Sequence, residues 1–269
     1  MTTDTPTYSL HQGSLPLLIS IPHLGTELPP EFAAGMSDSA PIKQDTDWHL
    51  DRLYGFAVGL GASVLQAKVS RYVIDLNRPP GGESLYPGQT TTGLCPTETF
   101  RGEPLYGLAQ APDAVQQADR LARYWQPYHA TLRAELDRLK ALHGAVLLWD
   151  AHSIASVLPR LFDGKLPDLN FGTADGRSCA PAIIDRVVAE VGATGFSHVV
   201  NGRFKGGYIT RHYGSPADHV HAIQLEMGQD LYMLEDPPFS YLEYKATSVQ
   251  PLLQKMLLQA LTALDRLAA

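Results

Sequence analysis

Short apolar runs, separated by polar and glycine-rich segments, dominate the pattern of hydrophobic positions along this chain. Three of them, Leu15–Ile21, Ala145–Asp150 and Ala222–Glu226, are too short for a stable helix and are typical of buried strands. Ala62–Gln66 and Tyr72–Leu76 show a similar pattern and are predicted as two further strands. The pattern therefore predicts a sheet whose central strands are covered on both faces.

Other segments show the spacing of helices. The clearest is Pro112–Leu142, where apolar residues recur every three or four positions and where Pro127 is expected to kink the helix or divide it in two. Pro181–Val191 is predicted as an amphipathic helix that begins with proline, and Ala246–Leu267 as a long C-terminal helix. Strands that alternate with such helices are typical of an α/β protein.

The order of these elements predicts a three-layer αβα architecture with a central mixed, mostly parallel sheet. One more helix is expected to begin at a cap on Asp45 or Asp47 and to run to about Gly59. No linker divides the 269 residues, so the chain is predicted to form a single domain over residues 1–269. Residues 79–108, rich in Gly, Pro, Thr and Ser, are expected to form a long irregular loop of the kind that serves function.

Charge and cysteine content narrow the functional classes. The formal net charge of −7 argues against electrostatic binding of nucleic acid or of an anionic membrane, so an anionic substrate must be held by local arginines. Cys95 and Cys179 are too few and too far apart for a disulfide scaffold, which favours a reducing compartment. Residues 1–13 lack the pattern of a signal peptide, and a cytoplasmic location is expected.

Polar residues at the ends of the predicted strands suggest an enzyme. His23 follows the first strand, His152 follows the strand that ends at Asp150, and Glu226 ends the last one. In open α/β sheets, active sites lie outside the carboxyl ends of the strands. A single histidine there is commonly a loop or core residue, but two at equivalent strand ends favour a metal site. Asp150 is placed to orient the His152 ring, as carboxylates do at metal sites.

The remaining chemistry of such a site has several candidates. A catalytic zinc-type site commonly uses two imidazoles and one carboxylate, and Asp45, Asp47 and Glu27 are each candidates for the third ligand. The alternative role of the two aspartates is helix capping. Glu226 lies in an otherwise apolar strand, where a carboxylate is costly unless it is paired or has a raised pKa. It is therefore either a general base or half of a structural ion pair.

Arginines supply candidates for binding an anionic substrate. Arg71, Asn77 and Arg78 flank a short apolar run, and guanidinium groups bind carboxylates as a fork, although each residue alone is also ordinary surface charge. The glycine-rich segment 201–214 adds Arg203, Lys205 and Arg211. A phosphate-binding loop is disfavoured there, because neither Gly-Lys-Ser/Thr nor the GxGxxG pattern occurs.

Five short motifs, in this order, resemble the N-formylglutamate amidohydrolases of histidine degradation. They are Ser20-Ile21-Pro22-His23-Leu24-Gly25, Asp45-Thr46-Asp47-Trp48, Asp75-Leu76-Asn77-Arg78-Pro79, Asp150-Ala151-His152-Ser153 and Leu225-Glu226-Met227. The resemblance runs from about Ser20 to the C-terminal helix. It implies a phosphorylase/hydrolase-like αβα fold related to zinc carboxypeptidases and aspartoacylase.

The resemblance also implies roles for individual residues. His23 and His152 match the two metal-binding histidines, and Glu226 matches the catalytic glutamate. Arg71 matches the arginine that polarises the scissile carbonyl, and Asn77–Arg78 match the pair that holds a substrate carboxylate.

One position departs from the carboxypeptidase pattern, which places a glutamate three residues after the first histidine. Thr26 stands there in this chain. The third metal ligand must therefore lie elsewhere, and Asp47 is preferred over Glu27 and Asp45.

The expected function is metal-dependent hydrolysis of N-formyl-L-glutamate to L-glutamate and formate. The substrate would be a small dicarboxylate whose second carboxylate is held by Arg211. The cofactor would be one divalent metal, zinc by preference, with Co, Mn, Ni or Fe also compatible with the ligands. One alternative is a related metal-dependent N-acyl-amino-acid deacylase or carboxypeptidase-like enzyme. Another is a non-catalytic protein that binds acidic amino acids, which the two histidines and Glu226 disfavour. The sequence predicts no oligomeric state.

Overall fold

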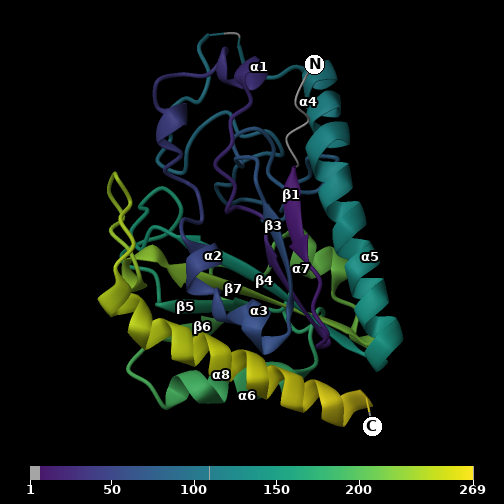
Figure 1. Ribbon diagram of the computed structural model, residues 1–269. Helices are drawn as coiled ribbons and strands as arrows, with labels where there is room; N and C mark the ends of the chain where they lie inside the picture. The colour runs from purple at the N-terminus through teal and green to yellow at the C-terminus, as the bar shows by residue number, and fades with distance from the viewer. Residues whose placement is uncertain (1–6, 109, 269) are drawn as a thin grey trace.

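A seven-stranded mixed sheet forms the centre of the computed structural model, which describes residues 7–108 and 110–268 (Figure 1). The strands follow the order β1-β3-β2-β4-β7-β5-β6 across the sheet. Only β1 with β3 and β5 with β7 pair antiparallel among the named strands. Their bounds are β1 Tyr8–His11, β2 Leu17–Ile21, β3 Ser63–Ala67, β4 Val146–Ile154, β5 Leu169–Gly172, β6 His198–Val200 and β7 Val220–Gly228. The mixed, mostly parallel sheet expected from the sequence is confirmed.

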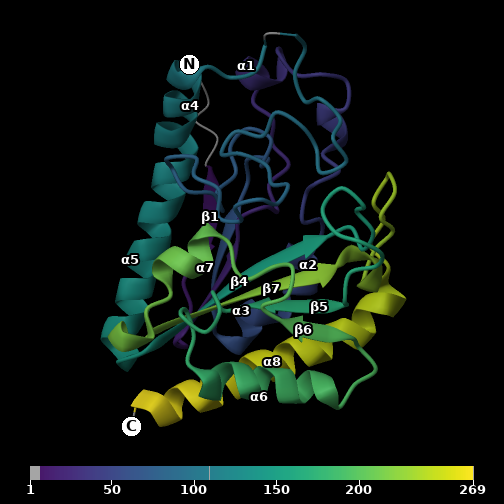
Figure 2. The same cartoon turned by 180° about the vertical axis from the view of Figure 1, so that it is seen from behind.

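Helices cover both faces of this sheet, as Figures 1 and 2 show. On one face, α6 (Pro181–Gly192) and α8 (Glu243–Ala268) lie side by side, with the short α2 (Leu50–Leu53) and α3 (Phe56–Leu60) beside them. The opposite face carries α5 (Gln126–His143) and α7 (Tyr208–Tyr213). The remaining short helices are α1 Pro30–Ala33 and the 3-10 turns Ala40–Ile42, Pro216–Asp218 and Gln229–Leu231.

The side chains of the central strands alternate between the two layers. Leu147 and Trp149 of β4 pack in the core on the α6/α8 side, whereas Val146 and Leu148 pack on the α5 side. Every residue of β2, β4 and β7 is buried. Because both faces are covered, these strands read as continuous apolar runs rather than as alternating ones.

The predicted helix over Pro112–Leu142 is present, and Pro127 does not divide it. It begins as α4 (Ala114–Arg120), capped by Asp113, passes through a π-helical turn at Leu121–Trp125 and continues as α5. A proline lacks the N–H that an α-helix needs at that point. The wider π turn immediately before Pro127 accommodates the missing backbone hydrogen bond. The segment therefore continues as one long helical rod (Figure 1).

The strand predicted at Tyr72–Leu76 is wrong, because this segment folds into turns. The N–H of Val73 donates to the Ser70 carbonyl, and that of Asn77 donates to the side chain of Asp75. Apolar residues such as Ile74 are nevertheless buried in the core on the α5 side. The apolar run therefore indicated burial correctly, but its backbone hydrogen bonds are made locally.

The helix expected from Asp45 or Asp47 to about Gly59 is also wrong. Two short helices, α2 and α3, replace it, and the residue before α2 is His49, with a left-handed φ of 60°. Neither aspartate caps a helix, because Asp47 lies beside His23 and His152 and the side chain of Asp45 accepts a hydrogen bond from the Phe100 N–H.

The loop expected at 79–108 is confirmed within the described residues, where that range forms turns and isolated bridges only. The strands β1, β5 and β6 and the helix α7 were not predicted from the sequence.

Within 7–108 and 110–268, the helices are all too short or too polar to cross a lipid bilayer.

A candidate metal centre at the carboxyl ends of the strands

The candidate residues gather around one cavity at the carboxyl ends of β2, β4 and β7. His152 on β4 stands directly opposite Glu226 on β7 in the parallel register, and His23 follows the end of β2. The cavity has a volume of about 600 Å³. Its lining includes His23, Asp47, Arg71, Asn77, Arg78, His152 and Glu226. All predicted site residues except Arg211 therefore line the same space.

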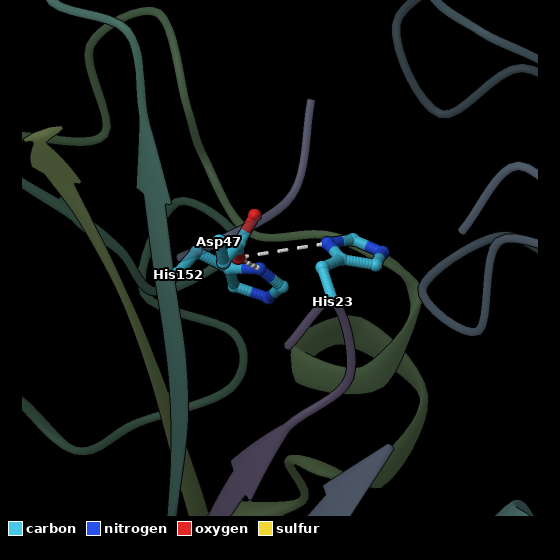
Figure 3. Close-up of side chains that lie close together, drawn as sticks. All are labelled: His23, Asp47 and His152. Carbon is cyan, nitrogen blue, oxygen red and sulfur yellow. Dashed lines mark hydrogen bonds and ion pairs between the residues drawn. The ribbon is translucent and has the colours of Figure 1, made fainter. Parts of the chain in front are cut away.

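Three buried side chains converge at the floor of the cavity: His23, Asp47 and His152 (Figure 3). Asp47 Oδ2 lies 3.0 Å from Nδ1 of His152 and 3.7 Å from Nδ1 of His23. One ligand atom from each residue lies within 4.8 Å of the others. Two imidazoles and one carboxylate are a common donor set for a catalytic zinc ion.

Each histidine also faces a second carboxylate with its other nitrogen. His23 Nε2 lies 2.7 Å from Asp75 Oδ1, and His152 Nε2 lies 3.2 Å from Asp150 Oδ1. A carboxylate in this position holds the ring proton on Nε2 and leaves the Nδ1 lone pair free for a metal. Both imidazoles are therefore oriented as metal ligands.

A buried oxygen of Asp150 supports this fit. Its Oδ1 has no hydrogen-bond partner within the described part of the chain. The His152 ring has two choices in this geometry: Nδ1–H toward Asp47, or Nε2–H toward Asp150. A cation among the three ligand atoms excludes the first, so that Nε2 then donates to the unpartnered oxygen. Asn77 Nδ2 lies 2.8 Å from His152 Nε2 and donates to it while Nε2 carries no proton; with the proton on Nε2 these two groups must move apart, and Asn77 keeps its bond to Asp150 Oδ2 at 3.2 Å. The residues present thus fit a divalent metal.

The electrostatics of the three convergent residues also favour positive charge between them. Burial alone would raise the pKa of Asp47, but the two histidine rings outweigh it and lower that pKa. Burial opposes the charged form of His152, yet Asp150 and Asp47 raise its pKa well above the usual range. The negative field of the buried carboxylates is therefore the dominant influence here.

Glu226 lies in the cavity beside the three residues and is not one of them. Burial raises its pKa to about 8, against the opposing effect of the positive His152 ring. Gln224, two residues earlier on the same face of β7, donates Nε2–H to Glu226 Oε2 at 3.2 Å. A carboxylate in this position is suited to exchange protons with a reacting group.

Arg71 lies beside the metal ligands and is held in place by Asp75. Its Nη2 donates to Asp75 Oδ2 at 2.7 Å, and its guanidinium lies over the ring of Phe100 at 4.6 Å. Nη1 lies 3.8 Å from Asp47 Oδ1. Asp75 therefore holds both Arg71 and His23, and this bridging role was not predicted from the sequence.

Arg78 lines the same cavity, where its Nη2 lies 3.9 Å from Asp75 Oδ2 and where it holds the loop at Thr92. Nε donates to the Thr92 carbonyl at 2.9 Å, and Nη2 donates to Thr92 Oγ1 at 3.3 Å. Asn77 lines the cavity, but its amide is occupied on both sides, because Oδ1 accepts from the N–H of Ile209 at 2.7 Å and Nδ2 faces Asp150 and His152. Asn77 therefore joins α7 to the metal ligands.

Arg211 is not part of the cavity lining, whereas Arg203 is. Arg211 Nε donates to the Gly206 carbonyl at 2.7 Å, and its guanidinium stacks on Tyr86. Arg203 Nη2 donates to the Thr90 carbonyl at 3.2 Å. Since both arginines belong to one glycine-rich segment, the sequence offered no signal to choose between them.

The alternatives for the third ligand lie elsewhere. Glu27 is exposed and forms an isolated bridge with Val69. Asp45 is buried and accepts a hydrogen bond from the Phe100 N–H at 2.8 Å. Of the three acidic candidates, Asp47 is the one that joins the two histidines.

Known proteins are similar to this chain over most of its length. The model of the N-formylglutamate amidohydrolase family matches residues 15–233. The N-formylglutamate deformylase of Pseudomonas putida is 55% identical over 258 residues, 95% of each chain. That of Pseudomonas aeruginosa is 53% identical over 250 residues, 93% of this chain and 94% of its own.

Two solved structures share the fold. The N-formylglutamate amidohydrolase from Ralstonia eutropha JMP134 is 27% identical, with a TM-score of 0.79 over 98% of both chains. A gene product of Agrobacterium tumefaciens is 16% identical, with a TM-score of 0.72 over 97% of both chains. The second similarity concerns the fold alone.

Proposed function

Because the chain belongs to the N-formylglutamate amidohydrolase family, we propose that it hydrolyses N-formyl-L-glutamate to L-glutamate and formate with the help of a divalent metal. The observation that carries the mechanism is the convergence of His23, Asp47 and His152 beside Glu226 in an arginine-lined cavity. Two N-formylglutamate deformylases match nearly the whole chain, which supports this choice of substrate.

His23, Asp47 and His152 would hold the metal through Nδ1, Oδ2 and Nδ1. When bound, a divalent ion supplies a Lewis acid for the formyl oxygen and lowers the pKa of water toward about 7. Zinc suits two imidazoles and one carboxylate, and Co, Mn, Ni or Fe are compatible with the same donors.

Two arginines that line the cavity bind the two carboxylates of the substrate in this proposal. Arg78 binds one carboxylate. The sequence had suggested Arg211 for the second carboxylate, but Arg203 is assigned to it here because Arg203 lines the cavity. Both guanidinium groups also hold the Thr90–Thr92 segment through hydrogen bonds. The substrate is thereby held at a fixed distance from the metal ligands, which brings the formyl carbon to one position.

Glu226 and Arg71 perform the chemical step. The Glu226 carboxylate takes a proton from the attacking water as the new C–O bond forms. Arg71, fixed by Asp75, donates toward the oxygen on which negative charge develops. Glu226 then passes the proton to the glutamate nitrogen, and the C–N bond breaks to release formate and a free amine.

The test of this function is release of formate by the purified protein from a set of N-acyl amino acids. Because two cationic groups anchor the substrate, kcat/KM for N-formyl-L-glutamate is expected to exceed that for N-formyl-L-aspartate and N-formyl-L-methionine by at least about tenfold. Equal rates on N-formyl-methionine would exclude the two-anchor model. An absence of formate from N-formyl-glutamate would exclude the function itself.

A comparison of three arginine variants tests the anchors. Arg78→Ala and Arg203→Ala are each expected to raise KM by about tenfold or more with little change in kcat, because a carboxylate clamp acts on ground state and transition state alike. Arg211→Ala is the matched control, since its guanidinium stacks on Tyr86 but does not itself line the cavity. Steady-state kinetics on N-formyl-L-glutamate measure the difference. A larger rise in KM for Arg211→Ala than for Arg203→Ala would restore the original assignment.

A cytoplasmic location is part of this proposal. It rests on Cys95 and Cys179, which are both free and buried. Free buried thiols are typical of a reducing compartment.

A further inference from the structure

The catalytic cavity borders two further hollows, each of which shares a different part of its lining. Arg78, Tyr86, Thr91 and Thr92 also line a small hollow. Phe100, Ser153 and Ile154 are shared with a second cavity of about 430 Å³. The metal ligands, Arg71 and Glu226 line the catalytic cavity alone.

Arg71 relates the acyl group of the substrate to a nearby aromatic ring. In the proposed function its guanidinium donates toward the oxygen of the scissile carbonyl, so the acyl group lies beside that guanidinium. The Phe100 ring stacks on the same guanidinium, with the ring centroid 4.6 Å from the guanidinium carbon. The group attached to the scissile carbonyl carbon therefore faces this ring.

Phe100 is held firmly enough to act as a wall. Its backbone N–H donates to the buried Asp45 carboxylate at 2.8 Å. Its side chain is 8% exposed and packs in a cluster with Ile154, Leu158 and Leu166. Because the ring is fixed on one side by Arg71 and on the other by this cluster, displacing it to admit a larger acyl group would force shifts in a packed region.

The second cavity lies directly behind this wall and offers apolar surface. Besides Phe100, its lining includes Ile154, Ala155, Leu158 and Phe239, together with acidic groups such as Asp45. A hydrocarbon chain finds apolar contacts there, whereas a carboxylate meets three acidic side chains, Asp45, Glu235 and Asp236, against one basic side chain, Arg101. The cavity is thus suited to an alkyl chain rather than to a second anion.

We propose that Phe100 is the specificity-determining wall that limits the acyl group to formyl, and that the cavity behind it becomes an alkyl-binding pocket when the ring is removed. The proposal rests on the proposed function. The reaction is unchanged: water adds to the acyl carbon, the C–N bond breaks, and the acyl group leaves as a carboxylate while the proton goes to the amine.

The experiment compares kcat/KM for N-formyl-, N-acetyl-, N-propionyl- and N-butyryl-L-glutamate within each variant. The wild-type protein is expected to lose at least about tenfold between formyl and acetyl. In Phe100→Ala the ratio of formyl to propionyl activity is expected to fall by at least about tenfold, since the surrounding side chains fill the space only in part. Ratios within one variant are independent of any general loss of activity.

Phe204→Ala is the matched control. Phe204 also lines the catalytic cavity and packs against Phe162, Arg203 and the cluster that contains Phe100, but it does not line the cavity behind Phe100. Its acyl-chain ratios are expected to stay at the wild-type values. If circular dichroism shows that Phe100→Ala does not fold, Phe100→Leu replaces it. In Phe100→Leu the ratio of formyl to propionyl activity is expected to fall in the same direction but by less.

Unchanged ratios in the Phe100 variants, or an equal shift in Phe204→Ala, would overturn the proposal. Such a result leaves formate release by the wild-type protein intact. Failure of the proposed function is a different outcome, in which the wild-type protein releases no formate from N-formyl-L-glutamate.

Discussion

Glu226→Gln is expected to lower kcat for formate release by about 10²- to 10⁴-fold while the protein keeps its metal. Glutamine has nearly the same shape as glutamate, and Gln224 still has an oxygen to which it can donate. The variant loses only the ability to take a proton from water and return it to the leaving nitrogen. Because Glu226 is not among the three convergent ligands, metal content measured by elemental analysis is expected to stay unchanged.

A buried glutamate away from the cavity provides the control. Glu135 accepts hydrogen bonds from Arg138 and Ser63 on the α5 side of the sheet. Glu135→Gln is expected to lower the melting temperature, because a buried ion pair is broken, but to leave kcat near the wild-type value. Near-normal turnover in Glu226→Gln would show that another group is the base.

Asp47→Asn is expected to weaken metal binding by more than about 100-fold and to abolish most of the activity. Even residues that only support metal ligands change metal affinity by about 10- to 100-fold, so loss of a charged ligand has a larger effect. Asp47 is 1% exposed, and its Oδ2 is the atom shared by both histidines. Elemental analysis after gel filtration measures the metal that remains.

Asp45→Asn is the matched control for this variant. Asp45 is also buried, and burial raises the pKa of its carboxyl to about 6. Its oxygen accepts the Phe100 N–H, which an asparagine oxygen accepts equally. Asp45→Asn is therefore expected to keep the metal. Loss of metal from Asp45→Asn but not from Asp47→Asn would reverse the choice of ligand.

The sequence predicted the part of the fold in which local pattern and burial agree. β2, β4 and β7 are covered on both faces, so each appears as an uninterrupted apolar run. The edge strands gave no such signal. β1 alternates between partly buried and exposed residues over four positions, and β6 has three residues. Strands this short depend on their pairing partners, which no local pattern reveals.

The same distinction explains which site residues were predictable. His23, His152 and Glu226 each stand at the end of a recognisable strand, so the rule for open sheets brings them together. Asp47 and Arg71 belong to irregular segments, whose positions depend on tertiary contacts such as the bond from Arg71 to Asp75. Spacing along the chain therefore left the third ligand open.

The sequence alone could not distinguish Arg203 from Arg211 as the second substrate anchor. They lie eight residues apart in one glycine-rich segment, and either is able to reach a substrate carboxylate on chemical grounds. Their directions are decided by the carbonyls that hold them, that of Leu161 for Arg203 and that of Gly206 for Arg211. Those contacts exist only in the folded chain.

The central claim is that a divalent metal held by His23, Asp47 and His152 is required for hydrolysis of N-formyl-L-glutamate. The most direct measurement is formate release while zinc is titrated into protein that a chelator has stripped of metal. Little turnover is expected in the stripped protein, with a rise in proportion to added zinc up to about one ion per chain, since residues 7–108 and 110–268 bring together one such group of ligands. Full activity in protein shown by elemental analysis to be metal-free would contradict it.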